Sequence, residues 1–391
     1  MTVLLGLLLG RLPIGWLQLV HNPARFAAAL AGVTFANVLV FMQLGFLGGL
    51  VESVALPYRA MDADILISAS DANSLGDGSP IPRQRLYQAL ATPGVARASA
   101  VYFGKLDWKQ PDGTVRNLDV FGIDPSGPVF TLAAINAALG KLQLSDTALI
   151  DRKTRNVPAN LFLAIDAGKP HVFEANNRTV AIAGTFEIGG GFTADGYLVV
   201  ADQTFLKLFK QRVAGAPNHV FVKVEPGRDV KGVVAALQAA LPASDVVVRT
   251  RAEAVAKDQN FQTTQKPVGI IFGFGIAMGL IVGTIIVYQV LTTDVADHLR
   301  EYATFKAIGY RQRFFLGIVF EQAIILALFG FVPGLLLALG LYGVINTATG
   351  LPIVMTPERP LLVLLGTIAM CSLSGALATR RLAKANPADL F

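Results

Sequence analysis

The chain has 391 residues, of which 53% are hydrophobic and only 15% are charged, whereas about a quarter of the residues in an ordinary soluble domain are charged. The formal net charge is +6, but arginine and lysine lie mostly beside the apolar runs and form no basic strip interleaved with aromatic residues, which argues against nucleic-acid binding. The single cysteine, Cys371, excludes an intramolecular disulfide and any cysteine-based zinc or redox motif.

The first 25 residues contain a leucine-rich stretch followed by Trp16. A cleaved signal peptide is one interpretation, with residues 29–31 (Ala-Leu-Ala) as its cleavage site. Against it, no basic residue precedes the leucines, and the apolar run continues through Ala31. We predict an interfacial helix within residues 1–25 that lies on the cytoplasmic leaflet with Trp16 at headgroup level, and the signal peptide remains the alternative.

Charge-poor runs predict four transmembrane helices. The first, residues 26–51, has 26 uncharged residues, and a helix of that length measures about 39 Å, which exceeds the ~30 Å hydrocarbon core. The second and fourth predicted spans are residues 267–293 and 360–379.

The third span begins in a longer uncharged run. The 36 residues from 322 to 357 carry no charge and would form a helix of about 54 Å, which is too long for one crossing. We therefore predict a span over residues 314–345 and a short external loop over 346–359, where Gly350 and Pro352 favour a turn.

The flanking charges predict the orientation. Basic residues lie before the first span, between the second and third spans, and after the fourth: Arg11, Arg25, Arg300, Lys306, Arg311, Arg313, Arg380, Arg381 and Lys384. The loop between the third and fourth spans offers only Arg359. Because short positive flanks stay in the cytoplasm, we expect both termini, including residues 380–391, to be cytoplasmic and residues 52–266 to be periplasmic.

Residues 52–266 have the composition of a folded domain. Runs of β-branched and aromatic residues alternate with two amphipathic helical patterns. We predict an α+β lobe, formed by residues 63–125 and 218–250, that is interrupted by a β-rich insert at 145–215. The predicted fold class is thus a membrane α-helical protein with four transmembrane helices and a large α+β extracytoplasmic domain between helices 1 and 2.

No catalytic constellation is recognisable. The sequence contains no P-loop, no His-Glu-x-x-His and no Gly-x-Ser-x-Gly motif, and its four histidines lack metal-ligand spacing. We therefore predict no catalytic, cofactor-binding or metal-binding residue, and no enzyme activity of the chain itself. Gly189-Gly190-Gly191 allows a ligand loop, but a triple glycine between strands favours a turn or bulge.

Few polar residues fall within the predicted spans. Asn37, Gln43 and Gln289 are predicted to form hydrogen bonds between helices. Glu321 is the exception among the ionisable groups, and such residues are functional candidates by default. It lies near the cytoplasmic end of its span, so snorkelling or pairing with Arg311 or Arg313 is an equal alternative.

The segment 294–313 is predicted to contain an amphipathic helix that ends at Ile308, with Gly309 at the left-handed position that follows a helix C-terminus. Val295, Leu299 and Tyr302 share one face. One interpretation is a helix on the inner leaflet, and the other is a docking helix for a cytoplasmic partner.

Residues 300–309 (REYATFKAIG) and the basic helix 380–384, which is followed by Asn386-Pro387, resemble motifs of the FtsX/MacB-type ABC transporter permeases of the mechanotransmission type. Residues 16–19 (WLQL) together with residues 41–46 (FMQLGF) look like the DevC version of the first span. The resemblance covers the whole layout of one span, a large external domain and three further spans.

The resemblance implies a homodimer in a bacterial inner membrane, with a separate cytoplasmic ABC ATPase dimer because the chain carries no nucleotide-binding domain. It also implies a periplasmic adaptor and an outer-membrane channel, in a tripartite efflux system for an envelope glycolipid or another amphiphile. No cofactor is implied for the permease. The expected ATPase-coupling residues are Arg300, Glu301, Tyr302, Phe305, Lys306, Ile308 and Gly309.

Two alternatives remain within this resemblance. An FtsX-like signalling subunit activates an envelope enzyme instead of exporting a substrate, and it copurifies with a peptidoglycan hydrolase. A lipoprotein-releasing permease acts on acylated proteins, so a deletion strain retains them.

Overall fold

The computed structural model describes residues 13–110 and 113–384, and the chain folds into two compact units. The helical unit contains the chain up to Gly48, Ile270–Ala348 and the chain from Ile353 onward, whereas the α/β domain contains Gly49–Gly269 and Thr349–Pro352. The first half of the predicted interfacial helix and the Asn386-Pro387 turn lie outside the described residues.

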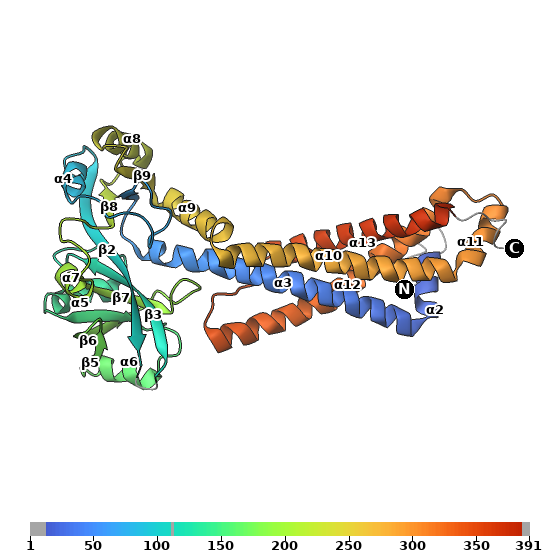
Figure 1. The fold of residues 1–391 in the computed structure, drawn as a ribbon, viewed down its shortest axis with the longest axis horizontal. Helices are drawn as coiled ribbons and strands as arrows, with labels where there is room; N and C mark the ends of the chain where they lie inside the picture. The colour runs from blue at the N-terminus through green and yellow to red at the C-terminus, as the bar shows by residue number, and fades with distance from the viewer. Residues whose placement is uncertain (1–12, 111–112, 385–391) are drawn as a thin grey trace. The chain divides into compact units, whose positions relative to one another are not determined.

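Within the described part of the chain, six helices form or enter the helical unit (Figure 1). They are α2 (Ile14–His21), α3 (Pro23–Ala60), α10 (Pro267–Asp297), α11 (Leu299–Ala307), α12 (Gln312–Thr349) and α13 (Glu358–Lys384). Four of them, α3, α10, α12 and α13, are long and apolar enough to cross a membrane, which confirms the predicted number of spans. α3 continues nine residues beyond the predicted end of the first span, from residue 51 to Ala60.

Glycines bring the long helices into close contact. A Cβ on Gly330 of α12 would come within 2.5 Å of the Val33 side chain of α3, and a Cβ on Gly283 of α10 would come within 2.3 Å of Met370 Sδ of α13. Small residues at such points let helix backbones approach each other closely. Transmembrane helices usually pack in this way, because the hydrophobic effect contributes little to helix association within lipid.

The α/β domain contains one continuous sheet of nine strands in the order β5-β6-β4-β7-β3-β2-β8-β1-β9. The strands are β1 (Ile65–Ala69), β2 (Val95–Lys109), β3 (Val115–Ile123), β4 (Thr147–Asp151), β5 (His171–Ala175), β6 (Arg178–Phe186), β7 (Gly196–Ala201), β8 (His219–Val224) and β9 (Val246–Thr250). Only the β3–β7 and β4–β6 pairs are parallel, and the other neighbours are antiparallel.

The continuity of the sheet differs from the predicted arrangement of a lobe and an insert. β7, which belongs to the expected insert, pairs with β3 from Leu118↔Gly196 to Ile123↔Ala201. All six residues of β7 are buried, so its backbone needs partners on both sides. The strands of the expected insert therefore extend the same sheet.

Apolar side chains cover both faces of the sheet, because successive residues of a strand point to opposite sides. Along β2, Val101 and Phe103 enter one buried cluster with Phe121, whereas Tyr102 and Trp108 enter another. Six helices complete the domain around the sheet (Figure 1): α4 (Gln84–Leu90), α5 (Ala133–Leu142), α6 (Ala159–Asp166), α7 (Asp202–Leu208), α8 (Val230–Ala240) and α9 (Arg251–Thr264).

The triple glycine forms a loop that lies against α3. Gly189 has a φ of +107°, and its N–H donates to the Asp151 carboxylate at 2.7 Å. A Cβ on Gly191 would lie 2.3 Å from the Ser53 Cβ, and the next residue donates its N–H to Ser53 Oγ at 3.3 Å. These contacts account for the glycines as a close backbone approach, in agreement with the predicted turn.

Candidate functional site: a buried polar network at the predicted coupling helix

The helix α11 ends as its sequence predicts. Gly309 has a φ of +102°, which glycine adopts without steric cost. Its N–H donates to Lys306 O at 3.1 Å, and the Tyr310 N–H donates to Phe305 O at the same distance. These bonds satisfy carbonyl groups of the last turn and separate α11 from α12 by a short turn.

The structure divides the seven predicted coupling residues into two groups. Tyr302 is buried, with 2% of its surface exposed, and Phe305 is half-buried against the rings of Phe314 and Tyr310. The other five are exposed: Arg300, Glu301, Lys306, Ile308 and Gly309. The exposed group is accessible at the surface of α11, while Tyr302 and Phe305 pack against other residues and anchor the helix.

Tyr302 reaches a hydrogen-bond network between four helices. Its hydroxyl donates to Gln18 Oε1 of α2 at 3.0 Å. The Gln322 amide of α12 donates to the same oxygen at 3.2 Å and to Asp294 Oδ2 of α10 at 2.6 Å. The network thus joins α2, α10, α11 and α12.

All four members are buried, and Gln322 has no exposed surface at all. Polar groups in such a place are costly when unpaired and rigidify the structure when paired. Outside this buried centre, Arg25 of α3 forms an ion pair with Asp297 of α10. We call Gln18, Asp294, Tyr302 and Gln322 the brace, because their hydrogen bonds hold α11 against its neighbours.

The Glu321 side chain of α12 lies beside the first turn of α2. Its Oε1 accepts the Trp16 backbone N–H at 3.1 Å, and a carboxylate beside the first turn of a helix is stabilised by the unpaired N–H groups there. A Cβ on Gly15 would lie 2.8 Å from Ile318 O, so α2 lies close to α12. Trp16 packs between Phe26 and Phe329.

The three amides predicted to join helices differ in their surroundings. Asn37 Oδ1 of α3 accepts the Thr367 hydroxyl of α13 at 2.5 Å. The Gln43 side chain lies over Gly275 of α10, where a Cβ would come within 2.4 Å of it. Gln289 is exposed and is not part of the brace.

Sequence reasoning missed Gln18, Asp294 and Gln322. Gln322 stands inside the uncharged run that predicted the third span, and Gln18 stands in a mostly apolar helix. Polar residues at such positions give a signal, but their partners lie up to 304 positions away in the chain. Only the packing of the helices brings them together.

A cavity with two buried carboxylates in the α/β domain

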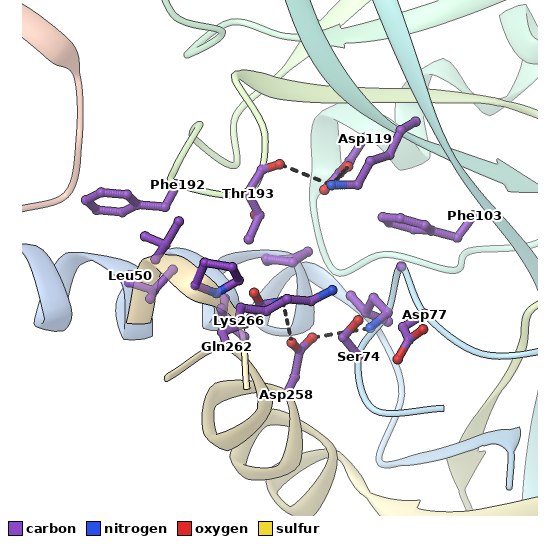
Figure 2. Close-up of a pocket in the computed structure, with 17 residues that line it drawn as sticks. Leu50, Ser74, Asp77, Phe103, Asp119, Phe192, Thr193, Asp258, Gln262 and Lys266 are labelled. Carbon is purple, nitrogen blue, oxygen red and sulfur yellow. Dashed lines mark hydrogen bonds and ion pairs between the residues drawn. The ribbon is translucent and has the colours of Figure 1, made fainter. Parts of the chain in front are cut away.

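A cavity of about 360 Å³ lies within the α/β domain. Its wall comes from the last turns of α3, the end of α9, the first residues of α10, β2 and β3, and two loops (Figure 2). Apolar residues form much of it, including Leu50, Val54, Phe103 and Phe192. The carboxylates of Asp77, Asp119 and Asp258 and the ammonium groups of Lys105 and Lys266 also line it.

Asp258 is fully bonded. Its carboxylate accepts the Tyr58 hydroxyl at 2.9 Å, the Leu75 N–H at 3.2 Å and the Gln262 amide at 3.2 Å. Burial nevertheless raises the pKa of Asp258 to about 6. This carboxylate holds α9 to the end of α3 and to the loop at Leu75.

Asp119 differs from Asp258 because one of its oxygens has no hydrogen-bond partner. Only 5% of the residue is exposed, and Oδ1 is buried without a donor. Lys105 Nζ lies 3.9 Å away, beyond hydrogen-bond distance, and donates instead to Thr193 O at 3.3 Å. Burial raises the pKa of Asp119 to about 7, although Lys105 lowers it and Asp258 raises it further.

The raised pKa of Asp119 predicts a pH-dependent cost to stability. An acid whose pKa is higher in the folded chain destabilises the fold increasingly as pH rises from 3.8 towards about 7. The full shift corresponds to about 4 kcal/mol. Asp119→Asn is therefore expected to leave stability at pH 4 nearly unchanged and to raise the free energy of unfolding by a few kcal/mol at pH 8.

Denaturant unfolding of the full chain in detergent, followed by Trp108 fluorescence in a Trp16→Phe background, measures this difference. The matched control is Asp107→Asn, because Asp107 is an exposed carboxylate on the neighbouring strand whose partner is Asn117 Nδ2 at 3.0 Å. Asp107→Asn is expected to change the free energy of unfolding by the same small amount at pH 4 and pH 8. A stability gain of Asp119→Asn that is equal at pH 4 and pH 8 contradicts a raised pKa of Asp119 in the folded chain.

Among the described residues, no group of three or more His, Cys, Asp or Glu side chains is placed to hold a metal ion. The cavity combines apolar walls with a few converging polar groups, as ligand-binding sites do. Its arrangement therefore fits binding of a small ligand.

Comparison with known families assigns both parts of the chain. Residues 26–240, more than half of the chain, match the MacB-like periplasmic core domain, and residues 232–387 match the FtsX-like permease C-terminal domain. None of the curated proteins compared with the chain matches it significantly.

Solved structures similar to the chain have low sequence identity. The periplasmic region of MacB from Actinobacillus actinomycetemcomitans is 11% identical at a TM-score of 0.34, covering 52% of this chain and 95% of its own. The extracellular domain of YknZ, a noncanonic ABC-type transporter from Gram-positive bacteria, is 12% identical at a TM-score of 0.31, and the match covers 48% of this chain and 98% of that domain. A domain of a putative permease from Porphyromonas gingivalis is 14% identical at a TM-score of 0.30, and the match covers 50% of this chain and 97% of that domain.

Proposed function

The chain belongs to the ABC transporter permeases that carry a MacB-like periplasmic core domain, and from this membership we propose that it is the membrane subunit of an ATP-driven exporter. In this proposal a separate ABC ATPase dimer binds a homodimer of the chain from the cytoplasm. A periplasmic adaptor and an outer-membrane channel complete a tripartite system that exports an envelope glycolipid or another amphiphile.

The observation that carries the proposal is the division of α11 into an exposed and a buried side. Arg300, Glu301 and Lys306 present charge to the exterior, and Tyr302 anchors the same helix in the brace. A force applied by an ATPase to the exposed side of α11 would therefore be transmitted to α2, α10 and α12.

The long helices offer a route for the motion. α3 and α10 each begin in one compact unit and end in the other without interruption. The four spans contain few ionisable groups, which fits transmission of movement better than an ion pathway through the membrane. Substrate is then moved on the periplasmic side by the α/β domain.

Affinity purification of the full chain in mild detergent, followed by identification of its partners, tests the proposal. We expect an ABC ATPase, an adaptor and an outer-membrane channel. Recovery of a peptidoglycan hydrolase in place of the adaptor and channel contradicts export and supports signalling. Acylated proteins as the bound cargo support a lipoprotein-releasing permease.

The orientation is tested by cysteine labelling in a Cys371→Ala background. Leu144→Cys in the α/β domain and Ile308→Cys after α11 are a matched pair, because both side chains are largely exposed. A membrane-impermeant maleimide added to cells with a permeabilised outer membrane is expected to label position 144 but not position 308. Labelling of position 308 alone contradicts the proposal.

A further inference from the structure

We propose that the cavity between Asp119 and Asp258 binds the ammonium head group of a cationic amphiphile, a primary amine attached to an apolar chain. The site lies wholly within the α/β domain. The inference does not depend on whether the chain exports a substrate or signals.

The charge of the wall favours a cation over an anion. Three carboxylates, Asp77, Asp119 and Asp258, line the cavity against two ammonium groups. Both lysines are already engaged: Lys105 donates to Thr193 O and lies 3.9 Å from Asp119 Oδ1, and Lys266 lies 4.8 Å from the centre of the Phe261 ring. An anionic ligand would add a negative charge to this surplus.

The hydrogen bonds of the wall favour a donor. Asp119 Oδ1 is a buried acceptor that receives no hydrogen bond, and a buried acceptor left without a donor costs about 1–3 kcal/mol, or more when charged. A primary ammonium group offers three donors and no acceptor. Figure 2 shows Asp119 and Asp258 apart from each other, and both line the cavity, so a head group bound at Asp119 Oδ1 also lies in the electrostatic field of the Asp258 carboxylate.

The remaining wall fits an apolar chain. Leu50, Val54 and Pro57 line the cavity from the last turns of α3, and Phe103 and Phe192 line it from the sheet and the β6–β7 loop. The volume of about 360 Å³ lies at the small end of ligand sites. A single short alkyl chain therefore suits it better than a large glycolipid.

The binding test uses the full chain in zwitterionic nanodiscs at pH 8. A Cys371→Ala, Thr193→Cys variant carries an environment-sensitive fluorophore on the cavity wall, because Thr193 lines the cavity. The probes are octylammonium, octanol and octanoate, which share one chain length and differ in the charge of the head group. We expect a saturable fluorescence change with octylammonium and at least tenfold weaker binding of the other two.

Substitutions distinguish the site from partition into lipid. Asp119→Asn is expected to weaken octylammonium binding at least tenfold, whereas the exposed Asp107→Asn leaves it unchanged. Equal affinity for octanol or octanoate, or unchanged binding by Asp119→Asn, overturns the proposal. The unfolding experiment on Asp119→Asn shows independently whether this variant remains folded.

The pH profile gives a second readout. The groups that act on Asp119 are Lys105 of β2 and Asp258 of α9, and the Asp119 charge in turn raises the pKa of Tyr197 of β7. Because the pKa of Asp119 is about 7, its carboxylate gains charge between pH 6 and pH 8, so octylammonium is expected to bind more tightly at pH 8. Asp119→Asn should reduce this difference, and a pH dependence that persists unchanged in the variant contradicts the role of Asp119.

Discussion

Replacement of Glu301 and Lys306 together by alanine is expected to abolish export and to weaken binding of the ATPase subunit at least tenfold. Both side chains are exposed on α11, whose anchoring residues Tyr302 and Phe305 stay in place. The physical reason is that charged side chains on a docking helix guide and orient the partner, and their loss leaves its complementary charges unpaired. Pull-down of the ATPase and its activity with the permease in nanodiscs measure the effect.

The matched control removes the same two charge signs from another surface. Glu225 and Arg228 form an exposed pair at 3.3 Å in the α/β domain, and such pairs contribute little to stability. Alanine at both positions is expected to leave ATPase binding unchanged. Membrane insertion should be normal in both double variants, and unchanged export by Glu301→Ala/Lys306→Ala refutes the coupling role.

Gln322→Leu is expected to detach α2 and α11 from the helical unit and to uncouple ATP hydrolysis from export. The substitution keeps the side-chain size but removes both hydrogen bonds that Gln322 donates. Asp294 then loses its donor in a buried position, which costs about 3 kcal/mol. The ATPase is expected to bind the variant but to drive export at less than a tenth of the normal rate.

Trp16 fluorescence reports the position of α2 directly. The chain has two tryptophans, so a Trp108→Phe background leaves Trp16 as the only reporter, packed against Phe26 and Phe329. Gln322→Leu is expected to shift its emission to longer wavelength as the indole becomes more exposed. Gln289→Leu is the matched control, because Gln289 is exposed in the span α10. This substitution should leave the emission wavelength of Trp16 unchanged. An unshifted emission with normal export in Gln322→Leu contradicts the brace.

The exposed and buried sides of α11 follow its amphipathic pattern. The pattern places Tyr302 on one face with Val295 and Leu299, and Tyr302 is buried whereas the charged Lys306 is exposed. The hydrogen-bond partner of Tyr302 could not be predicted, because Gln18 lies more than 280 positions earlier in the chain. Periodicity therefore predicts which side of the helix is buried, while packing decides which distant group each buried side chain meets.

The number of spans, the inserted domain and the glycine that ends α11 followed from the sequence alone. These features depend on local quantities, namely the length of uncharged runs, the alternation of apolar residues and the backbone freedom of Gly309, and a single sequence records all of them. The continuous sheet, the brace and the cavity did not follow from it. Each depends on groups brought together from distant segments, such as β7 beside β3, Gln322 beside Gln18 and Asp258 across from Asp119, and only the tertiary structure fixes which distant side chains become neighbours.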